Sequence, residues 1–286
     1  MTAVPSGARR PSELELGRRA FRRRQTTASV LIGVDSTILF AVVVWVTLIN
    51  TPGWAAVQRS FFDPATAISA LPRVFEGFLL NLQVLGYSVV AVALLAIVVA
   101  SLRTLRGPVF FPVRALAAGY TDLFRGLPLI IVLYLVGFGI PALINERIHF
   151  VVLGTVALTL TYGAYVSEVI RAGIEAVHPS QRLAARALGL THTQTLFRIV
   201  LPQATRKMTP ALMNDFVAMQ KDVGLISVLG AVDAVRAAQI ETAASYNFTP
   251  YVVAGVLFVL LAIPSIRLAD WYTARLRRRE QMGSIV

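Results

Sequence analysis

Residues 178–216 read HPSQRLAARALGLTHTQTLFRIVLPQATRKMTPALMNDF, a hydrophilic and basic stretch that lies between two apolar runs. The apolar runs approach the roughly 20 residues that a helix needs to cross a bilayer. A polar excursion between two such runs, residues 172–208, with signals for two short helices, is typical of a surface that holds a partner. The stretch therefore predicts a membrane protein with a structured loop outside the bilayer.

Two short helices are predicted inside this loop. The first begins at Ser180, whose side chain is expected to cap free backbone N–H groups, and Gly189 permits the left-handed turn that ends it. Thr191 and Gln194 have the T-x-x-Q spacing of a capping box, which begins the second helix. That helix is expected to run to Leu201-Pro202.

The first loop helix has one face of leucine and alanine, because Leu183 and Ala187, like Ala184 and Leu188, are four residues apart. Alanine lets two backbones approach closely, so this face suits docking into a groove on another protein. An amphipathic pair of helices lying on the membrane surface has the same pattern. The residues alone leave these two interpretations open.

The composition indicates an all-α integral membrane protein. The 286 residues are 56% hydrophobic, with a mean hydropathy of +0.67. The apolar residues form blocks of membrane-spanning length rather than a dispersed periodic pattern. Six spans are predicted, at Ala28–Asn50, Gly77–Ser101, Ala115–Ile140, Val151–Arg171, Thr209–Ala231 and Phe248–Leu268.

The spans divide the chain into four parts. Residues 1–27 and 271–286 are predicted to be basic cytosolic tails, and the first tail, Met1–Arg24, is expected to be flexible except where it meets lipid headgroups. Residues 28–76 hold the first span and an external loop. Residues 77–270 form a five-span core that contains the loop at 172–208.

The net charge of +12 is explained by membrane topology, and a nucleic-acid partner is not expected. The two tails, the connection around Arg103 and Arg114, and the loop at 172–208 hold most of the basic residues, and these segments alternate along the predicted topology. The positive-inside rule then places both termini and the loop in the cytosol. Contact with anionic membrane lipids is a further expectation for the basic C-terminal tail.

No motif for catalysis or metal binding is present. The chain has no cysteine, and its three histidines lie in or beside loops without a metal-ligand spacing. The sequence G-x-x-x-x-G-K-[ST], which cradles nucleotide phosphates, does not occur. No ATPase site, catalytic residue, metal or cofactor is therefore predicted within this chain.

The loop resembles the signature loop of type I ATP-binding-cassette (ABC) importer permeases, in which an E-A-A triplet precedes a glycine and, later, a leucine-proline pair. Three further motifs resemble the polar amino acid branch of that family, the histidine- and glutamine-type permeases. They are Arg125-Gly126-Leu127-Pro128-Leu129, the run from Ala164-Tyr165 through Glu168 to Arg171, and Lys221-Asp222. Four motifs in the expected order, over about two-thirds of the chain, identify it as a member of this family.

Two positions depart from the family pattern. Leu183 stands where the family's loop glutamate is expected, whereas Ala184, Ala185 and Gly189 match. A glutamate there would close a capping box with Ser180, so its absence is expected to cost up to about 1 kcal/mol of local helix stability. Val223-Gly224 also replaces the threonine-serine of the fifth-span motif. These changes are compatible with a specialised subunit or an altered ATPase partner.

The resemblance implies a six-helix permease subunit in a bacterial plasma (inner) membrane that imports a polar amino acid or a similar small polar solute. It implies two ATPase subunits, which bind ATP and Mg²⁺, a second permease chain that is a copy or a homologue, and an extracytoplasmic solute-binding protein. The residues that it assigns to the ATPase-coupling loop are Gln181, Leu183, Ala184, Ala185, Leu188, Gly189, Phe197, Leu201 and Pro202.

Charged residues at membrane depth are costly, so each is a candidate for pairing or for function. Glu168 and Arg171 are three residues apart on one helix face, so the two charges are expected to pair. As an alternative, Glu168 lines the solute path and meets the ammonium group of an amino acid. Tyr165 and Asn214 are further candidates for the solute path.

Two other charged pairs receive structural interpretations. Asp122 and Arg125 have the same spacing of three residues, and a structural salt bridge is expected between them. Lys221 and Asp222 are expected to lie at the seam between two permease chains.

Two other classes of protein fit parts of the sequence. A secondary transporter could couple uptake to an ion through Glu168 or Asp222, although the broken helices and internal symmetry typical of that class are not evident. An intramembrane enzyme is disfavoured by the missing catalytic motifs. Sensitivity of uptake to ATP depletion, as opposed to loss of the ion gradient, separates the importer from the secondary transporter.

Overall fold

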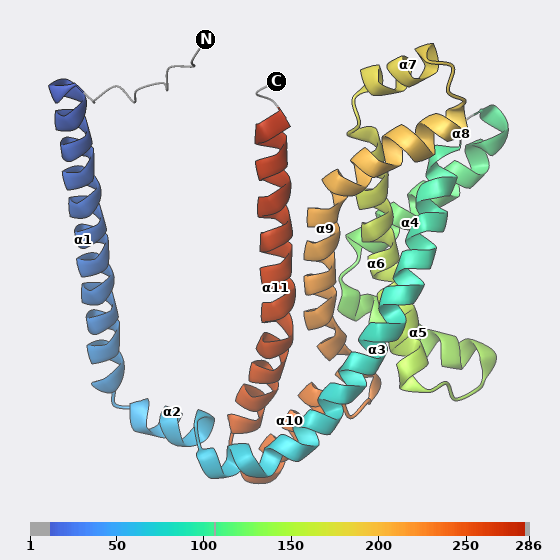
Figure 1. Ribbon diagram of the computed structural model, residues 1–286. Helices are drawn as coiled ribbons and strands as arrows, with labels where there is room; N and C mark the ends of the chain where they lie inside the picture. Colours follow the sequence, from blue (N-terminus) through green and yellow to red (C-terminus); the bar gives the residue numbers. More distant parts are fainter. Residues whose placement is uncertain (1–11, 106, 284–286) are drawn as a thin grey trace. The chain divides into compact units, whose positions relative to one another are not determined.

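The computed structural model describes residues 12–105 and 107–283, and every regular element within these ranges is helical (Figure 1). The chain divides into two compact units, residues 1–59 and residues 60–286. Four helices are long and apolar enough to cross a membrane, or six spans if each of two bent helix pairs is one span. The predicted all-α membrane fold is confirmed.

The first unit consists mainly of the helix α1, Glu13–Ile49. Ser12 caps it, and the Ser12 hydroxyl accepts a hydrogen bond of 3.3 Å from the Glu15 backbone N–H. The first predicted span, Ala28–Asn50, lies in α1 apart from Asn50, which is the C-cap. The helix begins well before the span, so residues 13–24 of the tail that was expected to be flexible are helical. Residues 1–11 of that tail lie outside the described part of the chain.

The expected external loop before the second span is largely helical. A short helix, α2, covers Trp54–Phe61, and the next, α3, runs from Pro64 to Thr104. Asp63 caps α3 by accepting hydrogen bonds from the backbone N–H groups of Ala65 and Thr66. Pro64 is compatible with the helix because it occupies the first helical turn, where its missing N–H costs nothing, whereas Pro72 lies inside α3.

The third predicted span is broken rather than continuous. Its first half is α4, Phe111–Gly126, which follows a 3₁₀ turn at Pro108–Phe110, and its second half is α5, Leu129–Ile144. The two helices are bent by 109°. Leu127 has an extended conformation because the following proline disfavours helical dihedral angles. The predicted span treated the run as one helix because most of it is apolar, although Pro128 was a local signal of the break.

The core of the second unit is built around α6, Phe150–Glu175, which packs along α3. Their buried faces contribute Val84, Val92, Leu158 and Tyr162 to the largest apolar cluster, where α5 adds Leu133. Gly163 allows this close packing, because a Cβ atom there would collide with the Leu95 side chain of α3. The predicted fourth span, Val151–Arg171, is confirmed as part of α6.

The loop at 172–208 contains α7, Pro179–Ala187, and α8, His192–Thr195, followed by a π turn at Leu196–Val200. The next helix, α9, covers Leu201–Asp222 and continues into a 3₁₀ segment at Val223–Leu229. The helix that contains the predicted fifth span therefore begins before Thr209. A helix that was not predicted, α10 at Ala234–Ser245, is bent by 55° from this segment.

The last helix, α11, runs from Thr249 to Gly283 and contains the predicted sixth span apart from its first residue, Phe248. The helix extends through residues 271–283, so the part of the predicted C-terminal tail that the structure describes is helical. The Gln220 amide on α9 donates a hydrogen bond of 2.9 Å to the Ser265 hydroxyl on α11, which joins the two spans.

A buried polar contact fixes the junction between α9 and α10. The Asn81 amide nitrogen on α3 donates to the Val223 carbonyl and to the Asp233 carboxylate, each at 3.0 Å. The Asn81 amide oxygen accepts from the Ala234 backbone N–H at 3.1 Å. Asn81 and Asp233 are both fully buried, so all of these groups depend on one another for hydrogen bonds.

Candidate functional site

The first loop helix, α7, begins at Pro179, one residue before Ser180, the predicted cap. His178 is the N-cap, and its Nδ1 atom accepts from the Ser180 backbone N–H at 3.2 Å. Pro179 takes the first helical position, which places Ser180 inside the helix, so the expected Ser180 cap is wrong. Gly189 has φ of +80°, as expected for the left-handed turn after the helix.

The coupling-loop residues of α7 lie on two different faces. Ala185 is buried, with 3% of its surface exposed, so it packs against the loop itself and is closed to a partner. Leu183 and Leu188 are 67% and 83% exposed, and Gln181 and Ala184 are exposed beside them. The exposed face contains large apolar side chains outside the apolar core, which is the usual mark of an interaction surface.

The second loop helix continues directly into the fifth span. Thr191 and Gln194 form the predicted capping box, with both reciprocal hydrogen bonds present. After α8 the chain makes a π turn, in which the Leu201 backbone N–H bonds to the Leu196 carbonyl. Pro202 then lies in the first turn of α9 instead of ending a helix, so the predicted end at Leu201-Pro202 is wrong.

This continuity has a mechanical consequence. A force applied to α8 reaches α9 through helical backbone, without an intervening flexible linker. Phe197, on the π turn, is 62% exposed, whereas Val200 is buried against Val177 and Ala204. The loop thus has a small apolar core of its own, and it also has apolar side chains that are exposed on its surface.

Two hydrogen bonds join the loop to the end of α6. Arg182 Nη2 on α7 donates to the Ile174 carbonyl at 2.7 Å, and Lys207 Nζ on α9 donates to the Ala176 carbonyl at 2.6 Å. These carbonyls belong to the last turn of α6 and its C-cap, where backbone acceptors lack helical partners and cations are favoured.

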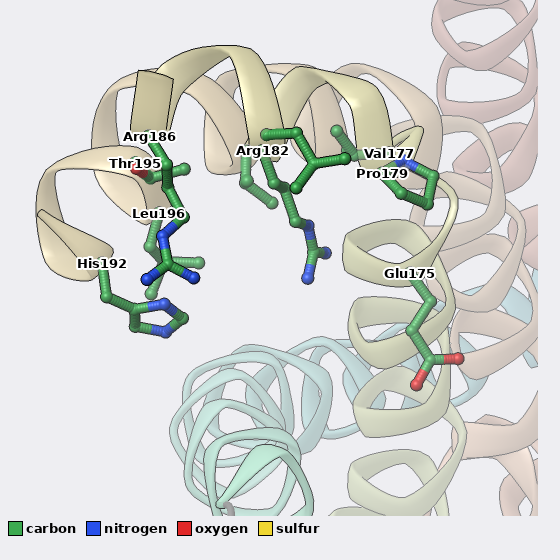
Figure 2. Close-up of a pocket in the computed structure, with 10 residues that line it drawn as sticks. Glu175, Val177, Pro179, Arg182, Arg186, His192, Thr195 and Leu196 are labelled. Carbon is green, nitrogen blue, oxygen red and sulfur yellow. The ribbon is translucent and has the colours of Figure 1, made fainter. Parts of the chain in front are cut away.

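A pocket of about 400 Å³ lies between α7, the π turn and the end of α6 (Figure 2). Its basic side chains are Arg182, Arg186 and His192, and its acidic side chain is Glu175. Arg186 and His192 lie at one end of the pocket and Glu175 at the other (Figure 2). The charge distribution suits an acidic group at the end formed by Arg186 and His192.

Glu168 is held by two arginines. Arg171 donates from Nη2 to Glu168 Oε1 at 2.6 Å and from Nε to Oε2 at 3.2 Å, as the spacing of three residues predicted. Arg103, at the end of α3, also bonds to Glu168 Oε2 at 2.5 Å and donates to the Thr121 hydroxyl of α4 at 3.2 Å. Arg171 reaches Glu175 as well. The Glu168 carboxylate therefore ties α3 to α6, and Arg103 extends this contact to α4 through Thr121.

Glu168→Gln is expected to destabilise the protein by about 2 kcal/mol, because it leaves two partly buried guanidinium groups without their shared carboxylate. Thermal unfolding of the detergent-purified chain measures this. Glu175→Gln is a suitable control, since Glu175 shares Arg171 but its side chain is 61% exposed, and its loss is expected to cost under about 0.5 kcal/mol. An equal loss of stability in the two variants would show that the Glu168 ion pairs do not hold the helices together.

The expected Asp122–Arg125 salt bridge is not present. Arg125 instead lies 5.9 Å from the centre of the Tyr165 ring, and its carbonyl accepts a hydrogen bond of 3.1 Å from the Tyr165 hydroxyl. Both Asp122 and Arg125 are exposed. The attraction of a guanidinium for an aromatic face, on the neighbouring helix α6, replaces the pairing along α4.

The charged residues of the fifth span point in different directions. The Asp222 carboxylate accepts a hydrogen bond of 2.8 Å from the Tyr162 hydroxyl of α6, whereas Lys221 is exposed. Asn214 is also exposed. Asp222 is therefore engaged within this chain, and the two adjacent charges do not share one environment.

Asp215 was not among the predicted site residues. One of its carboxylate oxygens, Oδ2, is buried and has no hydrogen-bond partner among the described residues. It lies within electrostatic range of Tyr162 and Arg125, and Asp222 follows it by seven residues on the same helix face. A buried carboxylate oxygen without a hydrogen-bond partner is costly in a membrane, which makes Asp215 a candidate to bind a ligand. The signal in the sequence was its interruption of an apolar span.

Residues 107–278 match the family of binding-protein-dependent transport system inner membrane components. The chain belongs to this family. It is 34% identical over 202 residues to the arginine transport system permease protein ArtQ of Bacillus subtilis strain 168, which covers 70% of this chain and 91% of ArtQ. It is 37% identical over 200 residues to a putative glutamine transport system permease protein, GlnP, of Rickettsia conorii, with 68% and 90% covered.

Solved structures agree with this membership. An amino acid ABC transporter crystallised with histidines superposes with a TM-score of 0.69 at 30% identity, covering 74% of this chain and 98% of that chain. The MetNI methionine ABC transporter, in an inward-facing conformation, superposes with a TM-score of 0.57 at 19% identity, which supports the fold alone. The predicted type I ABC importer permease fold is confirmed, and the chain is a permease subunit of an ABC importer.

Proposed function

We propose that this permease forms part of the translocation path of an importer for a polar amino acid, and that Asp215 receives the positively charged group of that solute. The observation that carries the proposal is the buried Asp215 oxygen without a hydrogen-bond partner among the described residues, within electrostatic range of Tyr162 and Arg125. An amino acid carries an ammonium and a carboxylate, which suit an acidic and a basic residue respectively. The names of the arginine and glutamine permease relatives support the same class of solute.

The roles of the other candidate residues follow from their contacts. Glu168 is not proposed to bind the ammonium group of the solute, because its carboxylate already forms ion pairs with Arg103 and Arg171. Tyr165 and Asn214 remain proposed residues of the solute path, since Tyr165 contacts Arg125 and Asn214 is adjacent to Asp215. Lys221 remains a proposed residue of the seam with a second permease, because its side chain is exposed.

The proposed partners are two ATPase subunits, a second permease that is a copy or a homologue, and an extracytoplasmic solute-binding protein. ATP and Mg²⁺ bind to the ATPases, which dock on the exposed face of the loop at 172–208. ATP-driven movement of that loop reaches the fifth span through the continuous helical path from α8 to α9. The positive-inside distribution of charge supports a cytosolic position for the loop and for both termini.

Asp215→Asn is expected to weaken solute binding by roughly 30-fold, because an ammonium loses its buried counter-charge. The measurement is uptake of a panel of labelled amino acids into proteoliposomes that contain the assembled transporter. Asp270→Asn is the matched control, since Asp270 is an exposed aspartate on α11, and it is expected to transport normally. Unchanged uptake and unchanged preference in Asp215→Asn, with every solute in the panel, would contradict the proposed site.

A further inference from the structure

A second pocket shares no lining residue with the pocket beside α7. It has a volume of about 250 Å³ and is lined by Arg206, Trp271, Tyr272, Arg275 and Leu276. Arg206 lies on α9, and the other four lie on α11, at the end of the candidate span Thr249–Leu276. The pocket therefore lies where α11 leaves its apolar segment.

The two arginines of this pocket are available to an anion. Among the side chains that the structure describes, neither guanidinium forms an ion pair with a carboxylate. The Arg275 guanidinium lies 5.2 Å from the centre of the Trp271 ring, a contact that orients it without neutralising its charge. Guanidinium groups bind phosphate oxygens through paired, directional hydrogen bonds. Two of them on separate helices form a cationic site between α9 and α11.

The surface that adjoins the pocket along α11 is apolar and exposed. Trp271, which is 55% exposed, has the amphipathic ring that favours the boundary between headgroups and acyl chains. The large exposed apolar side chains of α11 precede it, and they are Val256, Val259, Leu260, Ile263, Ile266 and Leu268. A ligand that has an anionic phosphate and long hydrocarbon chains would match both the pocket and this surface.

We propose that this pocket binds the phosphate of an anionic phospholipid headgroup, with Arg206 and Arg275 as its two cationic ligands. The acyl chains then lie along the exposed apolar face of α11. Free phosphate would gain from the two arginines but not from that face. Because the lipid contacts both α9 and α11, it bridges the helix that continues the coupling loop and the last span.

The test uses Trp271 of the full chain as the reporter, after Trp45→Phe and Trp54→Phe remove the other two tryptophans. The protein is placed in phosphatidylcholine nanodiscs that contain a small fraction of brominated lipid, which quenches tryptophan fluorescence on contact. Brominated phosphatidylglycerol is compared with brominated phosphatidylcholine. We expect a preference of roughly 30-fold for phosphatidylglycerol, as two arginines near an anionic lipid should provide.

Three variants make the result specific. Arg206→Gln with Arg275→Gln is expected to abolish the headgroup preference, and Arg206→Lys with Arg275→Lys is expected to retain most of it, because the charges remain. Arg267→Gln, which removes an exposed arginine of α11 outside the pocket, is expected to change nothing. Equal quenching by both lipids, or a preference that survives the double glutamine variant, would overturn the proposal. Reversal of the preference by excess inorganic phosphate would reassign the site to a free anion.

Discussion

Gly77→Leu is expected to leave almost no folded protein in the membrane. A Cβ atom at this position would overlap with the carbonyl group of Asp233 and the backbone nitrogen of Ala234, and backbone atoms cannot move aside as a side-chain end can. The leucine would separate α3 from the start of α10, one turn from Asn81. The buried Asn81–Asp233 hydrogen bonds would then be lost together with the packing.

The expected loss of stability is at least about 3 kcal/mol, from overpacking and from unsatisfied buried polar groups. The loss of stability is measured by heating the solubilised chain and determining, by size-exclusion chromatography, the fraction that stays folded at each temperature. Gly86→Ala is the matched control on the same helix, because its Cβ would have no atom within 4 Å. A Gly77→Leu protein that unfolds at the wild-type temperature would show that α3 and α10 do not pack as described.

Leu183→Asp combined with Leu188→Asp is expected to release the ATPase from the permease. Both side chains are large, apolar and mostly exposed on α7, whereas the buried Ala185 supports the loop from within. If each leucine fills a desolvated site on the ATPase, each loss costs about 2 kcal/mol, and the pair weakens binding roughly 1,000-fold. Co-purification of the ATPase with the tagged permease in mild detergent measures this.

The control for this experiment is Leu14→Asp, which makes the same chemical change at an exposed position of α1, 74% accessible. It is expected to leave the ATPase bound. Both loop positions are on the surface, so the double variant is expected to fold and to unfold at the wild-type temperature. An ATPase that remains bound to a folded double variant would place its docking site elsewhere on the chain.

Much of the architecture follows from local sequence. The capping box at Thr191 and Gln194 and the left-handed turn at Gly189 involve residues within a few positions of one another, and both were predicted correctly. The membrane fold was predictable because bilayer thickness alone sets the length of an apolar run. The break at Leu127-Pro128 had a local signal too, but the apolar composition on both sides outweighed it in the prediction.

Contacts between distant segments could not be predicted in the same way. Asn81 and Asp233 are 152 residues apart, and nothing near either one indicates the other. Arg103, on another helix, also pairs with Glu168, in addition to Arg171. This contact indicates that Glu168 joins two helices rather than binding solute. The spacing of Asp122 and Arg125 permitted a salt bridge, but Tyr165 on α6 offered Arg125 a competing contact.

The central claim, ATP-driven import through this permease, is tested most directly by uptake into proteoliposomes that contain the permease, its ATPase and its solute-binding protein. Uptake of a labelled amino acid is compared with ATP present or absent on the ATPase side, and with ion gradients intact or dissipated by ionophores. Uptake that requires ATP and persists without ion gradients is the predicted result. Uptake that continues without ATP and stops when the gradients are dissipated would contradict it and indicate an ion-coupled transporter.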